Sequence, residues 1–149
     1  MRVRDAMTKN PECCDRNTKI EDVARMMVAC DCGAIPVVED QQSKKPIGIV
    51  TDRDIVTRVV AQGENYAQRQ AGSAMTEFTV TISADADISQ AEAKMRDNHI
   101  RRLLVVDDSG ACIGIVSEAD LVRRLSGDEL EDMLRGIYEP MQEASAVAP

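Results

Sequence analysis

The chain has few aromatic residues and little positive charge. Among its 149 residues are two Tyr, one Phe and no Trp, so the core must be built from aliphatic side chains and methionine. The scarcity of rings also removes the stacking platforms on which proteins bind single-stranded nucleic acids. Since 26 Asp and Glu outnumber 18 Lys and Arg, the formal net charge is -8 and most of the surface repels a phosphate backbone. We therefore expect no nucleic-acid partner.

The chain also lacks long apolar runs and has a single histidine. No segment approaches the roughly 20 residues of a membrane span, and the charged residues after Met1 do not form the apolar region of a secretory leader. These features predict a cytoplasmic protein with no membrane partner. No nucleophile, general base and orienting residue occur at recognisable spacings, so we expect no enzymatic activity.

Five cysteines remain to be interpreted: Cys13, Cys14, Cys30, Cys32 and Cys112. Their odd number and the lack of a leader argue against a disulfide framework, so we expect most of them to be free and buried. Neither close pair has the two-to-four-residue gap that is common in zinc sites, and we expect no bound metal. A thiol-responsive role for these residues stays open.

An internal repeat organises the sequence. Ala6-Met7-Thr8 recurs as Ala74-Met75-Thr76, and Ile47-Gly48-Ile49-Val50 recurs as Ile113-Gly114-Ile115-Val116. The turn at residues 39–45 is shorter in the second copy, which marks it as a tolerant surface turn. Each copy alone would leave an apolar sheet face in water. We therefore predict an α/β (α+β) fold in which two β-α-β-β-α units pack back to back.

Hydrophobic periodicity places the elements of the first copy. We expect a helix that begins with a Thr18–Glu21 capping box, strands at residues 35–38 and 47–50, and a second helix. The side chains predicted to face inward from the two helices are Ile20, Val23, Ala24, Met27, Val28, Ile55, Val56, Val59 and Val60.

The second copy has the same order, with Asp87 and Gln90 at its first helix start and strands at residues 103–106 and 113–116. Its predicted inner residues are Ile88, Ala91, Met95, Leu121, Val122 and Leu125. A last helix, begun by a Ser126–Glu129 capping box, carries an apolar face of Leu130, Met133, Leu134, Ile137 and Tyr138, before a mobile tail from Pro140. The predicted boundaries are repeat 1 at 3–61, a connector at 62–72, repeat 2 at 73–126, and the last helix and tail at 127–149.

Both hairpins end where a strand runs directly into a helix, with Thr51 and Asp54 in one copy and Ser117 and Asp120 in the other. A helix N-terminus favours an anion such as phosphate, and a carboxylate one turn later has two acceptor oxygens for the diol of a ribose. The same hydroxyl-x-x-carboxylate pattern is also a capping box. Both interpretations stay open.

Arginines distinguish the two candidate sites. Antiparallel pairing brings Arg101 and Arg102 near Ser117 and Asp120, where guanidinium groups could hold a phosphate bidentately. Alternatively, they neutralise nearby surface carboxylates. At the first site the nearby cations are Arg53 and Arg58. We therefore expect the second site to hold phosphate better.

The doubled Ala-Met-Thr openings, the Gly-Ala-Ile-Pro-Val-Val and Arg-Arg-Leu-Leu-Val-Val strands and the two Gly-Ile-Val-Thr/Ser-x-x-Asp endings resemble a tandem cystathionine-β-synthase (CBS) domain pair, or Bateman module, over about residues 3–126. The resemblance implies pseudo-two-fold symmetry and a homodimer. It also implies a standalone regulatory module for an unidentified protein, which binds AMP, ADP or ATP, and less often S-adenosylmethionine, in clefts between the repeats.

By this resemblance, Thr51 and Asp54, and Ser117 and Asp120, take the ribose and phosphate roles. Adenine would lie near Ile35 and Val50 in one cleft and near Leu103 and Val116 in the other. Two segments depart from the family pattern. Leu104 stands where the family usually has Pro, and Glu12 and Cys13 occupy a first-strand segment that is usually apolar or Thr. The alternative function is a protein-interaction or thiol- or metal-responsive adaptor without a nucleotide ligand.

Overall fold

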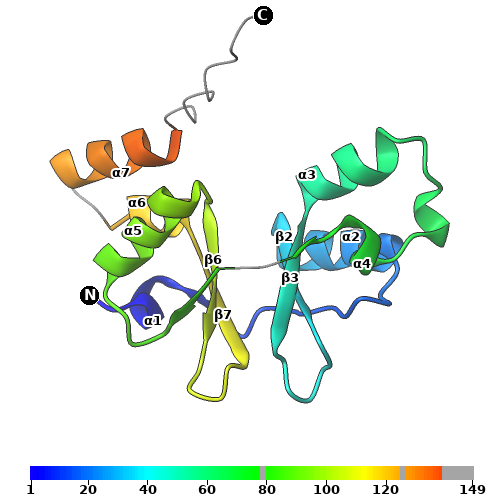
Figure 1. The fold of residues 1–149 in the computed structure, drawn as a ribbon, viewed down its shortest axis with the longest axis horizontal. Helices are drawn as coiled ribbons and strands as arrows, with labels where there is room; N and C mark the ends of the chain where they lie inside the picture. The colour runs from blue at the N-terminus through cyan, green and yellow to red at the C-terminus, as the bar shows by residue number, and fades with distance from the viewer. Residues whose placement is uncertain (78–79, 125–126, 139–149) are drawn as a thin grey trace, which may run out of the picture.

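The two copies form two halves that lie side by side, each with a hairpin and helices packed against it (Figure 1). A computed structural model describes residues 1–77, 80–124 and 127–138. The first half contains α2 (Ile20–Cys30), β2 (Ala34–Val38), β3 (Pro46–Thr51), α3 (Asp52–Ile55) and the π-helix η1 (Val56–Val60). The second half contains α5 (Ile88–Asn98), β6 (Arg102–Val106), β7 (Cys112–Ser117) and α6 (Glu118–Val122). This order confirms the predicted repeat and both hairpins.

Each Ala-Met-Thr opening completes the sheet of the opposite repeat. β1 (Thr8–Lys9), which follows α1 (Val3–Ala6), pairs antiparallel with β7, and β4 (Thr76–Glu77), which follows α4 (Ala71–Ala74), pairs with β3. With β5 (Thr81–Ser83) parallel to β6, the sheets have the strand orders β1-β7-β6-β5 and β2-β3-β4. The halves are therefore joined by backbone hydrogen bonds as well as by side-chain packing.

Glycine in the repeated Ile-Gly-Ile-Val strand permits this exchange. A Cβ atom on Gly48 would lie 2.7 Å from the carbonyl oxygen of Thr76, and one on Gly114 would lie 3.2 Å from that of Thr8. Both neighbours belong to the backbone of the exchanged strand and cannot rotate away. A side chain at either position would therefore push that strand off the sheet.

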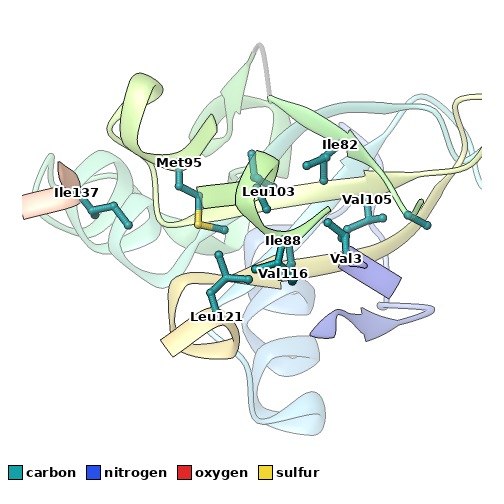
Figure 2. Close-up of a cluster of buried hydrophobic side chains, with 11 residues drawn as sticks. Val3, Ile82, Ile88, Met95, Leu103, Val105, Val116, Leu121 and Ile137 are labelled. Carbon is teal, nitrogen blue, oxygen red and sulfur yellow. The ribbon is translucent and has the colours of Figure 1, made fainter. Parts of the chain in front are cut away.

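The hydrophobic cores include residues from the exchanged segments. Val3 of α1 lies beside Val105 in a buried cluster that also contains Met95, Leu103 and Leu121 of the second repeat (Figure 2). The first-repeat core likewise includes residues of and next to α4, which are Ala71, Ala74 and Met75. A third, smaller cluster, the seam cluster, joins the hairpins of the two repeats through Val38, Leu104 and Cys112, with Cys13, Ile49 and Ile115 packed against it.

Several helix residues predicted to face inward are exposed. The exposed fraction is 84% for Val28, 56% for Val56 and 57% for Val60, and Ala24 is exposed as well. Val28 and Ala24 lie beside the narrow face through which α2 buries Ile20, Val23 and Met27. In η1 the hydrogen bonds span five residues, as from the amide of Ala61 to the carbonyl of Val56, so the spacing of an α-helix no longer applies. Only Val59 of η1 is buried.

The predicted capping boxes had different outcomes. The Thr18–Glu21 box is wrong, because α2 begins after Lys19 and the hydroxyl of Thr18 accepts the amide of Asp15 at 3.2 Å. The box at Asp87 is confirmed, since its amide donates to Oε1 of Gln90 at 3.0 Å. The Ser126–Glu129 box lies outside the described residues, as do Leu125 and the tail from Pro140.

The remaining elements follow the predicted order. The turn at residues 39–45 is ordered by Asp40, which accepts the amides of Gln42 and Ser43 at 2.8 and 2.7 Å. The connector contains η2 (Tyr66–Gln68) and the start of α4. The predicted last helix is present as α7 (Asp128–Tyr138), with Ile137 buried in the second-repeat core and Leu134 packed against it. Among the described residues, no helix combines the length and the apolar character needed to cross a lipid bilayer.

Candidate functional site

Both strand-to-helix corners are closed by capping boxes. The hydroxyls of Thr51 and Ser117 accept the amides of Asp54 and Asp120 at 3.1 and 3.3 Å. In return, Oδ2 of Asp54 and Oδ2 of Asp120 accept the amides of Thr51 and Ser117 at 3.0 and 2.8 Å. The capping interpretation is thus confirmed, and one oxygen of each carboxylate is engaged by its own helix. Since α6 has only five residues, side chains must supply most of any attraction for an anion.

The second oxygen differs between the two corners. Oδ1 of Asp54 lies 3.8 Å from Nη2 of Arg58, whose Nη1 donates to the carbonyls of Ala74 and Met75 at 3.0 and 2.8 Å. Within the described residues, no group bonds to Oδ1 of Asp120. The corner in the second repeat therefore retains an acceptor that the first corner uses for an ion pair.

A cleft of about 290 Å³ lies between the repeats, near the lower end of the size range of ligand pockets. It contains three of the residues predicted for the second site, Arg102, Ser117 and Asp120, and adds Ile35 from the first repeat. Its complete lining is Thr8, Pro11, Glu12, Cys30, Asp31, Cys32, Gly33, Ala34, Ile35, Arg102, Ile115, Ser117 and Asp120. One wall thus comes from each repeat, and the apolar side chains Ile35 and Ile115 accompany the polar groups.

Arg101 does not line this cleft, although it precedes Arg102. Its Nε lies 3.9 Å from Oε2 of Glu118, and its carbonyl accepts the amide of Glu118 at 2.8 Å. Arg101 lines a more open, adjoining hollow with Arg123 and Leu134, and Arg102 and Ser117 border both spaces. For Arg101, the structure therefore favours the interpretation of charge neutralisation.

The other predicted site residues lie apart from the cleft. Thr51 and Asp54 form the opposite corner, and Arg53 is exposed on α3. Val50, Leu103 and Val116 are fully buried in the cores of their own repeats, so their side chains do not reach the cleft wall. Ile35, which was predicted to share a cleft with Val50, instead lies with Ser117 and Asp120.

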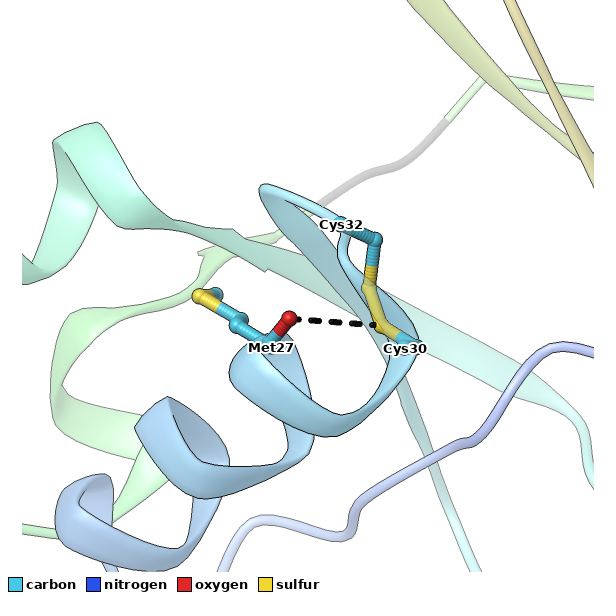
Figure 3. The surroundings of a disulfide bond; sticks show 3 residues. All are labelled: Met27, Cys30 and Cys32. Atoms are coloured by element: carbon cyan, nitrogen blue, oxygen red, sulfur yellow. Dashed lines mark hydrogen bonds between the residues drawn. A yellow bond between two sulfur atoms is a disulfide. The ribbon is translucent and has the colours of Figure 1, made fainter.

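Sequence reasoning missed the turn that contributes most to the first-repeat wall. α2 ends at Cys30 and is capped by Asp31, which has a left-handed backbone (φ 50°), and the amide of Cys32 donates to the carbonyl of Met27 at 3.0 Å. This turn brings the Cα atoms of Cys30 and Cys32 to 5.3 Å, and the two residues form a disulfide (Figure 3). This pair is the exception to the expectation that most of the cysteines are free. A Cys-x-Cys spacing at a predicted helix end was the available signal.

The other three cysteines are free, as predicted. Burial raises the pKa of Cys14 to about 12. Cys13 and Cys112 meet in the seam cluster, where their mutual hydrogen bond raises the pKa of Cys13 and lowers the pKa of Cys112. Leu104 belongs to the same cluster, whereas Glu12 lines the cleft. In the part of the chain that the structure describes, no group of three or more His, Cys, Asp and Glu residues could hold a metal ion.

Comparison with known proteins gives consistent matches. The CBS domain family model matches residues 3–61 and 71–127. An uncharacterized protein of Methanopyrus kandleri is 36% identical over 120 residues, which cover 80% of this chain and 58% of that protein. Hypoxic response protein 1 of Mycobacterium tuberculosis is 30% identical over 142 residues, which cover 95% of this chain and 97% of that protein. The chain thus spans little more than half of the first relative and nearly all of the second.

Solved structures share the fold. The CBS domain pair of protein MJ0100, in complex with 5'-methylthioadenosine and S-adenosyl-L-methionine, aligns with a TM-score of 0.74 and 26% identity, over 85% of this chain and 100% of that chain. A hypoxic response protein I with two coordinated zinc ions aligns with a TM-score of 0.73 and 29% identity, over 85% of this chain and 100% of that chain.

Proposed function

The chain belongs to the CBS domain family, and from this premise we propose that it is a regulatory module that binds an adenine nucleotide or related adenosyl compound in the cleft between its repeats. The observation that carries the proposal is the meeting of Arg102, Ser117 and Asp120 of one repeat with Ile35 of the other in one cleft. The complex of protein MJ0100 with two adenosyl compounds supports the same ligand class. The proposal includes no catalytic role.

Two polar and two apolar side chains of the cleft contact the ligand in this proposal. Oδ1 of Asp120 accepts a hydrogen bond from a ribose hydroxyl, while Oδ2 stays on the helix cap. The guanidinium of Arg102 holds the phosphate. The side chains of Ile35 and Ile115 provide apolar surface for the base.

The charges of the cleft rank the candidate ligands. Its lining contains three carboxylates, Glu12, Asp31 and Asp120, against the one guanidinium of Arg102. A triphosphate would bring several negative charges into this acidic environment, whereas AMP brings fewer. The positively charged sulfonium of S-adenosylmethionine is attracted by the carboxylates. We therefore rank AMP and S-adenosylmethionine above ATP as ligands. The family resemblance alone ranks S-adenosylmethionine below the adenine nucleotides.

Isothermal titration calorimetry tests the proposal with AMP, ATP and S-adenosylmethionine, each added to the purified protein. We expect saturable heat with AMP or S-adenosylmethionine and weaker binding of ATP. Mass spectrometry of the small molecules released by denaturing the protein provides an independent identification. An absence of heat with all three compounds, from protein that carries no ligand already, would refute the proposal.

We also propose a homodimer formed through an exposed apolar surface on the first repeat. Val28, Val56 and Val60, each more than half exposed, lie on α2 and η1 of that repeat. α3 contacts both of these elements, so the three exposed apolar side chains belong to the same group of helices, and we take that group as the dimer interface. Light scattering on the eluting protein measures the mass directly, and a monomer at all concentrations would reject this part.

The Cys30–Cys32 disulfide favours a second candidate, a thiol-responsive adaptor that binds no nucleotide. In that case the oligomeric state would change with oxidation, and none of the adenosyl compounds would bind. Light scattering with and without a dithiol reductant, beside the calorimetry, separates the two functions.

A further inference from the structure

The Cys30–Cys32 disulfide forms part of the wall of the proposed ligand cleft. Both cysteines and the intervening Asp31 line it, together with Ser117 and Asp120 of the second repeat. Cys30 is exposed and also borders an open hollow on the outer surface, while Cys32 is half-buried against the first-repeat core. A small dithiol can therefore reach the bond from solvent, and a ligand in the cleft lies beside it.

The turn that carries the disulfide is packed closely on the rest of the site. Gly33, the next residue, accepts the amide of Asp52 through its carbonyl at 3.0 Å. A Cβ atom on Gly33 would lie 2.9 Å from Oδ2 of Asp52, so the turn lies directly against that side chain. From Gly33 the chain continues directly into β2 and Ile35, which lines the cleft. A change in the shape of the turn is therefore transmitted to the wall.

The second repeat shows that the turn does not need the disulfide. His99 has the same left-handed backbone as Asp31 (φ 52° and 50°), and the amide of Ile100 donates to the carbonyl of Met95 at 3.0 Å, as Cys32 does to Met27. Asn98 and Ile100 stand where the first repeat has its cysteines. The bond also closes a loop with a sequence separation of only 2, so it restricts the unfolded chain very little. The disulfide therefore contributes little to the stability of the folded protein.

We propose that Cys30 and Cys32 form a two-electron redox site whose oxidation state controls ligand binding in the cleft; this inference rests on the proposed function. A thiolate of a dithiol reductant attacks Sγ of Cys30, breaks the S–S bond and releases the thiolate of Cys32. The second thiolate of the reductant then displaces Cys30, and the reductant becomes a cyclic disulfide. Two electrons and two protons pass to the protein, which gains two thiols. A small-molecule disulfide reverses the reaction.

Reduction weakens binding because separated sulfurs need more space than bonded ones. Bonded sulfurs lie about 2 Å apart, whereas two thiols repel each other to van der Waals distance. Since both cysteines line the cleft, the separated sulfurs take up space beside a bound ligand. We expect affinity for AMP or S-adenosylmethionine to fall about fivefold or more on reduction, at the lower end of typical coupling between sites. By reciprocity, a saturating ligand shifts the equilibrium with the dithiol toward the disulfide by the same factor.

The test compares calorimetric titrations of the oxidised and the dithiothreitol-reduced protein with AMP and with S-adenosylmethionine. The oxidation state of each sample is verified by intact mass and by counting thiols under denaturing conditions. The double variant Cys30→Ser/Cys32→Ser is the matched control, because it keeps Cys13, Cys14 and Cys112. We expect the reductant to change the affinity of the parent protein and not that of the double variant.

Each outcome decides a different question. Equal affinity of the oxidised and reduced protein, with binding present, overturns the redox inference and leaves the proposed function intact. No binding in either state overturns the proposed function, and the inference falls with it. A change with reductant that persists in the double variant assigns the effect to the other cysteines and overturns the role of Cys30 and Cys32. Failure of the parent protein to form the disulfide with oxidised glutathione also overturns it.

Discussion

Thr8 pairs with Ile115 across the two repeats, and both residues line the cleft. The hydrogen bonds that attach the opening segment of the first repeat to the sheet of the second therefore also form part of the wall of the proposed ligand cleft. An isolated repeat would lack this strand as well as one wall of the cleft. Under the proposed function, ligand binding thus requires the folded pair.

Replacement of Gly114 tests the exchange of the opening segments. In Gly114→Ala the new Cβ meets the carbonyl of Thr8 at 3.2 Å and Sδ of Met7 even more closely. We expect a loss of about 1 to 3 kcal/mol in the free energy of unfolding, as for other overpacked sites, measured by urea titration. Gly48→Ala should have a similar effect, because its Cβ would lie 2.7 Å from the carbonyl of Thr76. An unchanged urea midpoint in both variants would contradict the exchange.

The two capping aspartates should differ in binding but not in stability. Asp54→Ala and Asp120→Ala each remove an acceptor from a helix cap, so we expect each to lose about 1 kcal/mol of stability. Only Asp120→Ala should weaken AMP binding, by about tenfold or 1.4 kcal/mol, since Asp120 lines the cleft and Asp54 does not. Asp120→Asn keeps one acceptor oxygen for the helix cap, so it separates the effect on AMP binding from the effect on stability. Equal losses of affinity in the two Ala variants would speak against the assigned cleft.

Two adjacent arginines provide a matched test of the phosphate role. Arg102→Gln should lower the affinity for AMP about tenfold and leave the affinity for adenosine unchanged, because only AMP carries the phosphate. Arg101→Gln should bind both ligands as the parent protein does, since Arg101 lies outside the cleft beside Glu118. Calorimetry with both ligands gives the comparison. A loss of adenosine binding in Arg102→Gln would mean that the side chain supports the cleft rather than the phosphate.

Charge on the exposed apolar surface should prevent dimerisation. The double variant Val56→Asp/Val60→Asp places carboxylates where the exposed fractions are 56% and 57%. Because both positions face solvent, we expect the unfolding temperature of the protomer to stay near that of the parent. Light scattering should then report a monomer, with Thr57→Asp on the same helix as the control. A persistent dimer would place its interface elsewhere.

Acid should weaken the turn between β6 and β7. Asp107 accepts the hydroxyl of Ser109 at 2.7 Å and the amides of Ser109 and Ala111 at 2.9 and 3.0 Å, which lowers its pKa below the ordinary value of 3.8. Its contribution to stability is therefore present above pH 3.8 and is lost as the pH falls through the lower pKa of the folded state. Asp107→Asn should flatten the fall in unfolding temperature in that acidic range. The control variant Asp108→Asn should show the same fall in unfolding temperature as the parent protein.

Local patterns in the sequence predicted the elements that depend on near neighbours. The strands at residues 35–38 and 47–50, the Asp87–Gln90 cap and the buried Ile88, Ala91 and Met95 were all recognisable. Side-chain periodicity and hydrogen bonds over three or four residues are set within one segment, which is why these predictions were confirmed. The exposure of Val56 and Val60 was not predicted, because the spacing of apolar residues does not indicate a change from α-helix to π-helix.

By itself, the sequence determined that the protein is a repeated hairpin-and-helix unit with two strand-to-helix corners. Only the tertiary structure decided which residues share a cleft: Ile35 joins Asp120 rather than Asp54, and Arg102 joins them without Arg101. It also brought Cys30 and Cys32 together at the cleft wall. The physical reason is that the opening strands are exchanged between the repeats, and pairings between distant segments depend on how whole sheets pack, which a short stretch of sequence does not encode.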